Sequence, residues 1–159
     1  MTRARFARLS SFALMALLLA AGPARSGTGW TPDTIPWQTQ APNGTRYALL
    51  EGDRQSADAP FSYAFSIPAG VWDSPHSHSA TARVFVVRGV LRIGFGDRFD
   101  TALARAYPAG SYLVVPAGAV HFDGSDVDTV IIGTATGPWS TTYRDGSLPA
   151  SAGTPLPHR

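Results

Sequence analysis

The chain has 159 residues, of which 44% are hydrophobic and 15% are charged, and this corresponds to one ordinary globular domain with a core of its own. The sequence contains no cysteine, which excludes disulfide bonds, thiolate metal sites and cysteine nucleophiles. It also contains no lysine, so Schiff-base chemistry and a phosphate-binding P-loop are excluded as well. Only one of the 11 acidic residues is a glutamate, Glu51.

The first 26 residues have the layout of a secretory signal peptide. Arg3, Arg5 and Arg8 form a positive start, an apolar run follows over residues 12–21, and small residues surround Ser26. Because a membrane-spanning helix needs about 20 apolar residues, this run is too short to cross a bilayer. We therefore predict cleavage after Ser26 and a periplasmic or secreted protein. An uncleaved membrane anchor is the alternative.

The formal net charge of +2 comes from this same segment. Its removal takes away four of the 13 arginines and no acidic residue, which leaves nine arginines against 11 acids. The remaining arginines are scattered along the chain and form no basic cluster. We therefore expect neither a nucleic-acid partner nor, after cleavage, a membrane partner.

The rest of the chain predicts an all-β fold. Residues 27–46 are expected to form an extended N-terminal arm, since three prolines interrupt them. The clearest strand is residues 61–68, where apolar and small or polar side chains alternate. The other expected strands are 47–51, 83–88, 90–95, 112–115, 129–135 and 140–143.

Two further stretches complete the predicted organisation. Residues 101–106 are the only helix-permissive stretch, and it is short. The proline-containing residues 147–159 are expected to form a flexible C-terminal tail, so that the barrel occupies residues 47–146. Short strands separated by glycine and proline turns are typical of a sandwich or a jelly roll.

The histidines are the chemically informative residues. His76 and His78 are two residues apart, so in a strand both imidazoles would lie on the same face. Imidazole is the commonest neutral metal ligand, and two imidazoles on one face can chelate an ion. Taken alone, the pair is equally compatible with a polar turn after Pro75. His158 lies in the expected tail and is predicted to be inert.

The spacing around these histidines resembles the two sequence motifs of the cupin superfamily. The first motif is matched by Gly70, His76, His78 and Gly89, and the second by Gly110, Pro116, Gly118 and His121. About 20 residues separate the two motifs, as is usual in that superfamily. Over roughly residues 47–143, the chain therefore resembles a small single-domain bacterial cupin of the RmlC-like kind.

This resemblance implies a cupin-type jelly-roll β-barrel in which His76, His78 and His121 bind one divalent metal ion. The glutamate that usually follows the second histidine by four positions is Ala82 here, and Arg83 comes next. The resemblance thus supplies three neutral ligands and no carboxylate, which favours Fe, Zn, Cu or Ni over a harder ion such as Mn. The opposite interpretation is a cupin that has lost its metal.

No acid or base residue stands out beside the expected ligands. Asp73, Asp123 and Asp126 flank them in the sequence, and Asp123 could share a strand face with His121. Aspartates beside turns usually cap the turn or face solvent. The asparagine that often follows the histidine of the second motif by four positions is Ser125.

The remaining candidates are aromatic. Tyr63 and Tyr112 alternate with their strand neighbours and are expected to face the barrel interior, chiefly as core residues. Trp30, Trp37 and Trp139 are expected to pack the arm on the barrel or to form dimer contacts. None of them is assigned a substrate-binding role.

The expected function is that of an exported, metal-dependent, dioxygenase-like enzyme acting on a small oxygenated organic substrate. Two alternatives stay open, namely a non-catalytic periplasmic cupin that binds a small ligand or a metal, and a cupin isomerase, lyase or decarboxylase. A homodimer is also expected. Because jelly rolls leave strand edges that need covering, the apolar arm with Trp30 and Trp37 is expected to pack outside the barrel.

Overall fold

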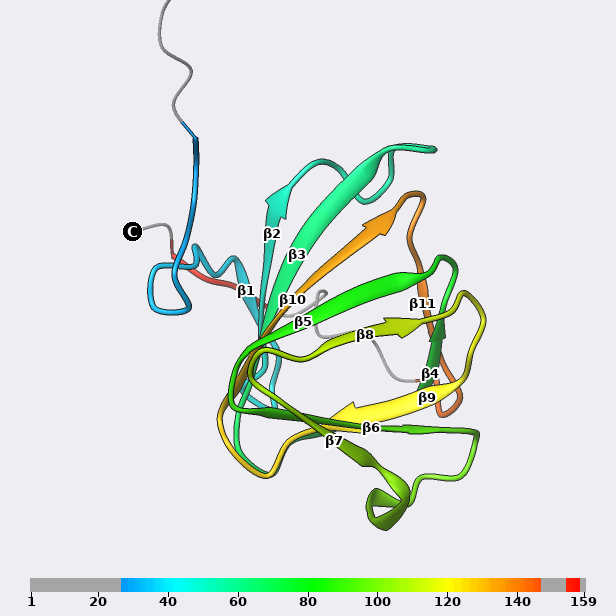
Figure 1. Ribbon diagram of the computed structural model, residues 1–159. Helices are drawn as coiled ribbons and strands as arrows, with labels where there is room; N and C mark the ends of the chain where they lie inside the picture. The colour runs from blue at the N-terminus through cyan, green and yellow to red at the C-terminus, as the bar shows by residue number, and fades with distance from the viewer. Residues whose placement is uncertain (1–26, 147–153, 158–159) are drawn as a thin grey trace, which may run out of the picture.

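The computed structural model describes residues 27–146 and 154–157, which form two antiparallel β-sheets facing one another in a jelly roll (Figure 1). The signal peptide expected over residues 1–26 lies outside the described residues, as does His158. Within the described part of the chain, no helix is long and apolar enough to cross a membrane. The prediction of an all-β jelly roll is confirmed.

The two sheets are built from twelve strands of the described chain, all paired antiparallel. The seven-stranded sheet has the order β12 (Thr154–Pro155), β1 (Thr39–Gln40), β2 (Arg46–Glu51), β3 (Pro60–Ile67), β10 (Thr129–Thr136), β5 (Ala82–Arg88), β8 (Tyr112–Val115). The five-stranded sheet has the order β11 (Thr141–Tyr143), β4 (Trp72–His78), β9 (His121–Gly124), β6 (Val90–Phe95), β7 (Arg105–Pro108).

The core lies between the two sheets and follows from the period-2 pattern of the strands. On β3, Phe61, Tyr63 and Ile67 are buried among the inward side chains, as their spacing predicts. Opposite Tyr63, β10 carries Gly133, and a Cβ atom at that position would overlap the tyrosine ring. The glycine therefore makes room for the large side chain of the neighbouring strand.

The N-terminal arm covers the outer face of the seven-stranded sheet. Ile35 and Trp37 pack there against small and β-branched side chains that include Ala48, Ala64 and Val130. Strand β10 is consequently covered on both faces, which explains why its apolar run is continuous rather than alternating. An ion pair between Asp33 and Arg88 (2.7 Å) adds a surface contact between arm and sheet.

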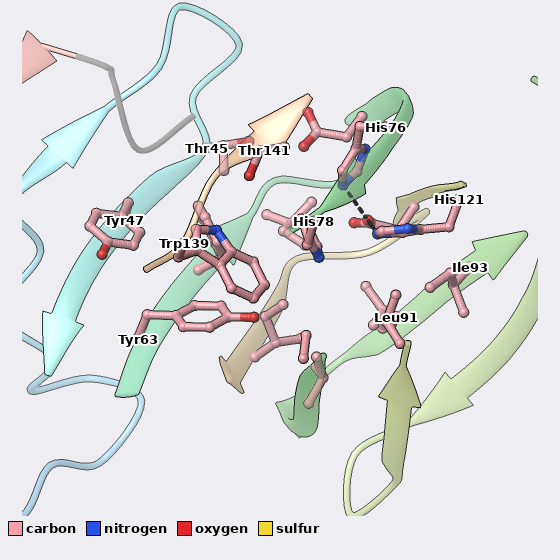
Figure 2. A pocket seen from close by; sticks show the side chains of 18 of the residues that line it. Thr45, Tyr47, Tyr63, His76, His78, Leu91, Ile93, His121, Trp139 and Thr141 are labelled. Carbon is pink, nitrogen blue, oxygen red and sulfur yellow. Dashed lines mark ion pairs between the residues drawn. The ribbon is translucent and has the colours of Figure 1, made fainter. Parts of the chain in front are cut away.

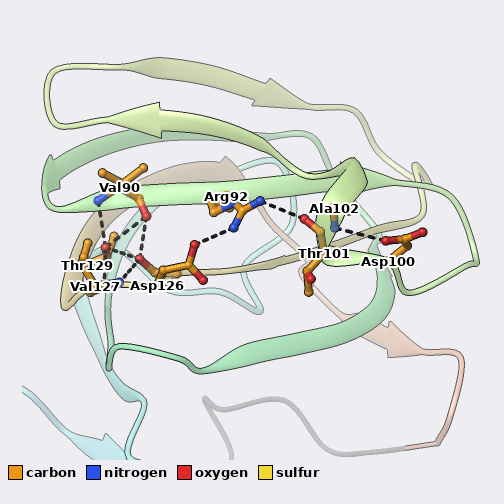
Figure 3. A network of polar contacts seen from close by, with 9 residues as sticks. Val90, Arg92, Asp100, Thr101, Ala102, Asp126, Val127 and Thr129 are labelled. Carbon is orange, nitrogen blue, oxygen red and sulfur yellow. Dashed lines mark hydrogen bonds and ion pairs between the residues drawn. The ribbon is translucent and has the colours of Figure 1, made fainter.

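A hydroxyl cluster secures the turn between β5 and β6 (Figure 3). Gly89 forms this turn with a φ of +76°, and a side chain there would collide with Asp128. The Thr129 hydroxyl accepts from the Val90 amide (3.0 Å), and the Ser125 hydroxyl donates to the Val90 carbonyl (2.7 Å). Ser125, at the position where the second cupin motif often has asparagine, is therefore a structural residue.

The helix-permissive stretch 101–106 forms only a single 3₁₀ turn at Thr101–Leu103, with Asp100 accepting from the Ala102 amide (3.1 Å), before β7 begins (Figure 3). Two sequence-based expectations need correction. Tyr112 does not face the interior, because it is 50% exposed and stacks on Phe85 outside β5 and β8. Strands β4 and β9, which carry the histidines, were not expected from composition.

Part of the predicted tail is also structured. Thr154–Pro155 forms β12 and pairs with Thr39–Gln40 of the arm. The limits predicted for arm, barrel and tail otherwise remain predictions.

Candidate metal centre

The three histidines of the two motifs come together at one edge of the interior (Figure 2). Strands β4 and β9 are neighbours in the five-stranded sheet, and His76 pairs directly with His121 across them. His78 follows His76 by two positions on the same face, so its ring lies 4.8 Å from that of His121 between centroids. One ring nitrogen from each histidine lies within 4.8 Å of the other two.

The local backbone fixes the tautomer of two of these imidazoles. Nδ1 of His76 lies 2.8 Å from the carbonyl oxygen of Ser74, and Nδ1 of His121 lies 3.0 Å from that of Ala119. Because a carbonyl oxygen can only accept, each Nδ1 carries the proton and each Nε2 presents a lone pair. This is the arrangement of metal-ligating histidines held by a backbone carbonyl.

His78 differs from the other two histidines. Its Nδ1 is buried and finds no hydrogen-bond partner among the described residues. Its ring packs against the indole of Trp139, with 4.3 Å between the ring centroids. A buried nitrogen without a partner costs free energy unless something else satisfies it. Together with the two free Nε2 atoms, this donor set fits a divalent metal ion that accepts nitrogen ligands.

Burial keeps the imidazoles of His78 and His121 neutral. Together with the nearby His121, His76 and Arg54, it lowers the pKa of His78 to about 2. Burial also lowers the pKa of His121, although the Asp123 carboxylate opposes that shift. A neutral imidazole is the form that binds a metal, so protons compete poorly for these two histidines at ordinary pH.

A β-bulge brings Asp73 into the same interior. Asp73 pairs with Asp123, yet His76 pairs with His121, so β4 advances three residues where β9 advances two. The extra residue lets both Asp73 and His76 line the cavity despite their odd spacing. The Tyr143 hydroxyl donates to Asp73 Oδ2 at 2.8 Å. Burial, and then the charge of Asp123, raise the pKa of Asp73.

Asp123 is the carboxylate nearest to the histidines. Its Oδ2 lies 3.8 Å from Nε2 of His76 and 3.8 Å from Nε2 of His121. Asp126, the third aspartate that flanks the ligands in sequence, points outward and pairs with Arg92 (2.5 Å). The structure therefore brings Asp73 and Asp123 to the site and excludes Asp126 from it.

The histidines and these two aspartates line a cavity of about 90 Å³ between the sheets. Its remaining wall comes largely from apolar side chains of the seven-stranded sheet, including Phe61, Val84 and Leu113. Ala82 also lines it and is fully buried, whereas Arg83 is exposed. The position that usually carries the cupin glutamate therefore faces the cavity, as expected, and offers only a methyl group.

Two aromatic lining residues were missed or misplaced by sequence reasoning. Trp139 is 7% exposed and packs on His78, Phe61 and Tyr63 inside the molecule, rather than on the arm or at a dimer contact. Tyr143 reaches the site because its strand pairs with β4 beside His76. Nothing in the period-2 pattern marks either residue as functional.

Arg54 and Tyr47 form a polar region of the same cavity. The Arg54 guanidinium lies 5.3 Å from the centre of the Tyr47 ring, and both residues line the cavity. Arg54 Nε and the Tyr47 hydroxyl are buried without a hydrogen-bond partner in the described chain. The Arg54 carbonyl accepts from the Trp139 amide (2.9 Å), which fixes the backbone of this loop. Arg54 lies in a polar loop, so its sequence context gave no signal of this role.

Comparisons with known proteins give a family match over most of the chain and a likeness of fold. The family model described as a ChrR cupin-like domain matches residues 26–140. The chain is 36% identical over 63 residues to "Germin-like protein 5-1" of Oryza sativa subsp. japonica, covering 39% of this chain and 28% of that protein. It is 39% identical over 70 residues to "Rhicadhesin receptor" of Pisum sativum, covering 42% of this chain and 32% of that protein.

The chain thus spans less than a third of the length of these curated relatives. Among solved structures, it is similar to a "putative acetylacetone dioxygenase" from Methylibium petroleiphilum PM1, with a TM-score of 0.57 and 21% sequence identity. That similarity covers 80% of this chain and 89% of the other. At this level of identity the likeness is one of fold.

Proposed function

Since the chain belongs to the ChrR cupin-like family, we propose that it is a metal-dependent cupin whose ligands are His76, His78 and His121. The metal is a divalent ion, and the reaction is a dioxygenase-type oxidation of a small oxygenated organic substrate. The observation that carries this proposal is the convergence of three largely buried imidazoles, two with Nε2 free, at the wall of an apolar cavity.

A metal at this position would polarise bound oxygen-containing groups and supply redox chemistry if it were iron. The chain's own residues do the rest. Tyr143 and Asp73 share a hydrogen bond beside His76, and the raised pKa values of both groups favour a proton held between them. This pair is placed to hold or release one proton next to a reacting substrate.

The cavity supports a small substrate of mixed character. Its volume of about 90 Å³ and its apolar wall fit a compact hydrocarbon body. The unpaired Arg54 Nε and Tyr47 hydroxyl would bind an oxygen of that substrate, and an anionic oxygen best of all, because Arg54 is positively charged. The dioxygenase name of the structural neighbour is consistent with such a substrate.

The first experiment is a calorimetric titration of metal-free protein with Zn²⁺. Wild type is expected to bind one ion, and His121→Ala is expected to lose more than about 100-fold in affinity, since a lost ligand costs more than a lost outer-shell partner. His158→Ala is the matched control, because His158 lies outside both motifs. Equal binding by wild type and His121→Ala would remove the three-histidine site.

The second experiment separates an enzyme from a binding protein. Protein loaded with Fe²⁺ is supplied with pentane-2,4-dione and with small carboxylates, and O₂ consumption is followed with an electrode. Uptake that disappears in His121→Ala supports the oxygenase. Tight metal binding without uptake on any of these compounds favours the non-catalytic cupin or a non-oxidative reaction.

We also propose that the protein is exported. The support is the positive start, the short apolar run and the small residues before Gly27. Protein purified from the cell envelope is expected to begin near Gly27 or at Arg25. A full-length product beginning at Met1 in the cytoplasm would contradict export.

A homodimer is proposed for the same protein. In the described chain, β8 ends the seven-stranded sheet and carries the exposed Tyr112 and Val114. An edge strand with apolar side chains is a favourable surface for a second copy. Light scattering is expected to give twice the mass of the chain, and a monomer at micromolar concentration would contradict this.

A further inference from the structure

The three histidine ligands proposed for the metal provide no negative charge to balance that of the ion. Three neutral imidazoles leave the full +2 of a divalent ion uncompensated, and the usual glutamate position is Ala82. Ala82 faces the cavity with a methyl group and Arg83 faces solvent, so neither supplies a carboxylate. A buried cation without an anionic ligand is unfavourable, because burial removes the water that would otherwise screen it.

Asp123 is placed to provide that charge from another strand. It follows His121 by two residues on β9, so both side chains leave the same face of the five-stranded sheet. Its Oδ2 is 3.8 Å from Nε2 of both His76 and His121, and these are the two nitrogens whose lone pairs are free. In Figure 2 these two imidazoles lie at the same part of the cavity wall.

The distances from Asp123 Oδ2 to the two Nε2 atoms are closer to those between two ligands of one metal ion than to those of a hydrogen bond. A nitrogen and an oxygen bound to the same zinc at about 2.0–2.2 Å lie roughly 3.0–3.5 Å apart in tetrahedral or octahedral geometry. A distance of 3.8 Å is too long for a hydrogen bond and needs only a small contraction to fit a shared ion. No hydrogen bond from the described residues reaches the Asp123 carboxylate, so it is free to bind.

The other carboxylate of the cavity is already engaged. Asp73 Oδ2 accepts the Tyr143 hydroxyl at 2.8 Å. No imidazole nitrogen of the described histidines lies within ion-pair distance of Asp73, whereas two lie within that distance of Asp123. Asp123 is therefore the better placed of the two for a metal held by the histidines.

We propose that Asp123 is the fourth protein ligand of the metal. It would take the place of the motif glutamate, which is Ala82 in this chain. This inference rests on the proposed metal-binding function. With Asp123 bound, the site carries three nitrogens and one carboxylate oxygen, and an octahedral ion keeps two open positions rather than three. A carboxylate also restores affinity for hard ions, so Mn²⁺ and Fe²⁺ are bound better than three imidazoles alone would allow.

The test compares matched aspartate variants of the full mature chain by competition with a coloured chelator, using Zn²⁺ and Mn²⁺ alone as probes. Asp123→Asn is expected to lose at least tenfold in Zn²⁺ affinity and clearly more in Mn²⁺ affinity. Asp126→Asn is the control, because Asp126 lies three residues along the chain and pairs outward with Arg92. It is expected to stay within about twofold of wild type.

Two further readouts distinguish a ligand from a residue that only positions the histidines. The visible absorption spectrum of Co²⁺-loaded protein is expected to change in Asp123→Asn, because a ligand is lost, and to be unchanged in Asp126→Asn. Ala82→Glu is expected to restore much of the lost affinity in the Asp123→Asn background and to add little to wild type. Such non-additivity indicates that both carboxylates serve one ion.

The outcomes are separable from those of the proposed function. Wild-type binding that His121→Ala abolishes but Asp123→Asn leaves within twofold would overturn this inference and keep the three-histidine site. An unchanged Co²⁺ spectrum in Asp123→Asn would likewise overturn it. Absence of wild-type binding would overturn both proposals. Circular dichroism on each variant confirms that the jelly roll is intact.

Discussion

The two sheets of this jelly roll face the same cavity but contribute different chemistry to it. The five-stranded sheet supplies the titratable side chains, with His76, His78 and Asp73 on β4 and with His121 and Asp123 on β9. The seven-stranded sheet supplies mainly aromatic and aliphatic walls. The difference shows that a jelly roll can carry its packing side chains on one sheet and its reactive side chains on the other. Substitutions on one sheet should then have little effect on the role of the other.

Ala82 lies on β5 of the seven-stranded sheet, which supplies the apolar wall. A glutamate there would project from the seven-stranded sheet across the cavity toward the histidines, whereas Asp123 lies on the same sheet as they do. If Asp123 binds the metal, every protein ligand comes from two adjacent strands. The opposite wall is then entirely free to shape the space for a substrate.

The largest expected effect concerns the packing side. Phe61 is 2% exposed on β3, and its ring packs on Trp139 with 5.7 Å between centroids. Phe61→Ala is expected to lower the free energy of unfolding by about 3–5 kcal/mol, because it leaves a cavity in the core. Urea denaturation followed by tryptophan fluorescence measures this. Phe95→Ala on β6, where the side chain is 56% exposed, is the control and is expected to change stability little. Equal losses of stability in Phe61→Ala and Phe95→Ala would contradict the assignment of core packing to the inward side chains of the seven-stranded sheet.

The next effect concerns His78 on the five-stranded sheet and is a dependence of the free energy of unfolding on pH. The pKa of His78 is lowered by burial in the folded state, so below about pH 6.5 the unfolded chain binds a proton that the folded chain does not. Metal-free wild type should therefore lose stability as the pH falls from 6 to 4. The contribution of one such group is at most about 1.4 kcal/mol per pH unit. Denaturation of wild type and His78→Gln at several pH values measures it, and His78→Gln should show the shallower slope. Parallel pH profiles would show that His78 does not remain neutral.

A third prediction concerns the fit between β3 and β10. Gly133→Ala would place a methyl group against the Tyr63 ring and is expected to cost about 1–3 kcal/mol through overpacking. The same substitution in a Tyr63→Leu background should cost much less, because the obstructing ring is gone. Thermal or urea denaturation of the four proteins of this cycle provides the measurement. An additive cycle would mean that the glycine serves a backbone role instead.

The smallest effect compares ion pairs on the outer faces of the two sheets. The Arg88 and Asp33 side chains are 47% and 75% exposed, so Asp33→Asn is expected to cost no more than about 0.5 kcal/mol and nothing measurable in high salt. Arg92 is 26% exposed and also donates to the Thr101 carbonyl (2.9 Å). Asp126→Asn should therefore cost more, up to about 1 kcal/mol. Denaturation at low and high ionic strength tests the order, and the reverse order would contradict it.

Much of the fold could be predicted because it is encoded locally. The alternation on β3 depends on neighbouring residues, and that prediction is confirmed. Strand β7 could not be predicted, because its four residues show no alternation and its first two belong to the helix-permissive stretch 101–106. Tyr112 shows the limit of alternation, since period 2 gives two faces without saying which one is inside.

The site was predictable only where motif spacing describes it. The three histidines come together as the cupin resemblance implies. Asp73 could not be placed, because a bulge on β4 reverses the face that its spacing predicts. Trp139 and Arg54 enter through loops that contact each other across the fold, by the hydrogen bond from the Trp139 amide to the Arg54 carbonyl. Contacts between loops far apart in sequence leave no periodic signal.

The carbonyls of Ser74 and Ala119 have a consequence for how fast and at what entropic cost an ion is captured. Each lies two residues before the histidine whose Nδ1 it accepts from, so two of the three imidazoles are oriented by the backbone just before them, within β4 for His76 and in the turn before β9 for His121. Little rotamer freedom then remains to be lost when an ion arrives. Capture is therefore governed by removal of water from the ion, with little contribution from ordering of the chain. In this respect the jelly roll differs from small zinc domains, which fold only around their metal.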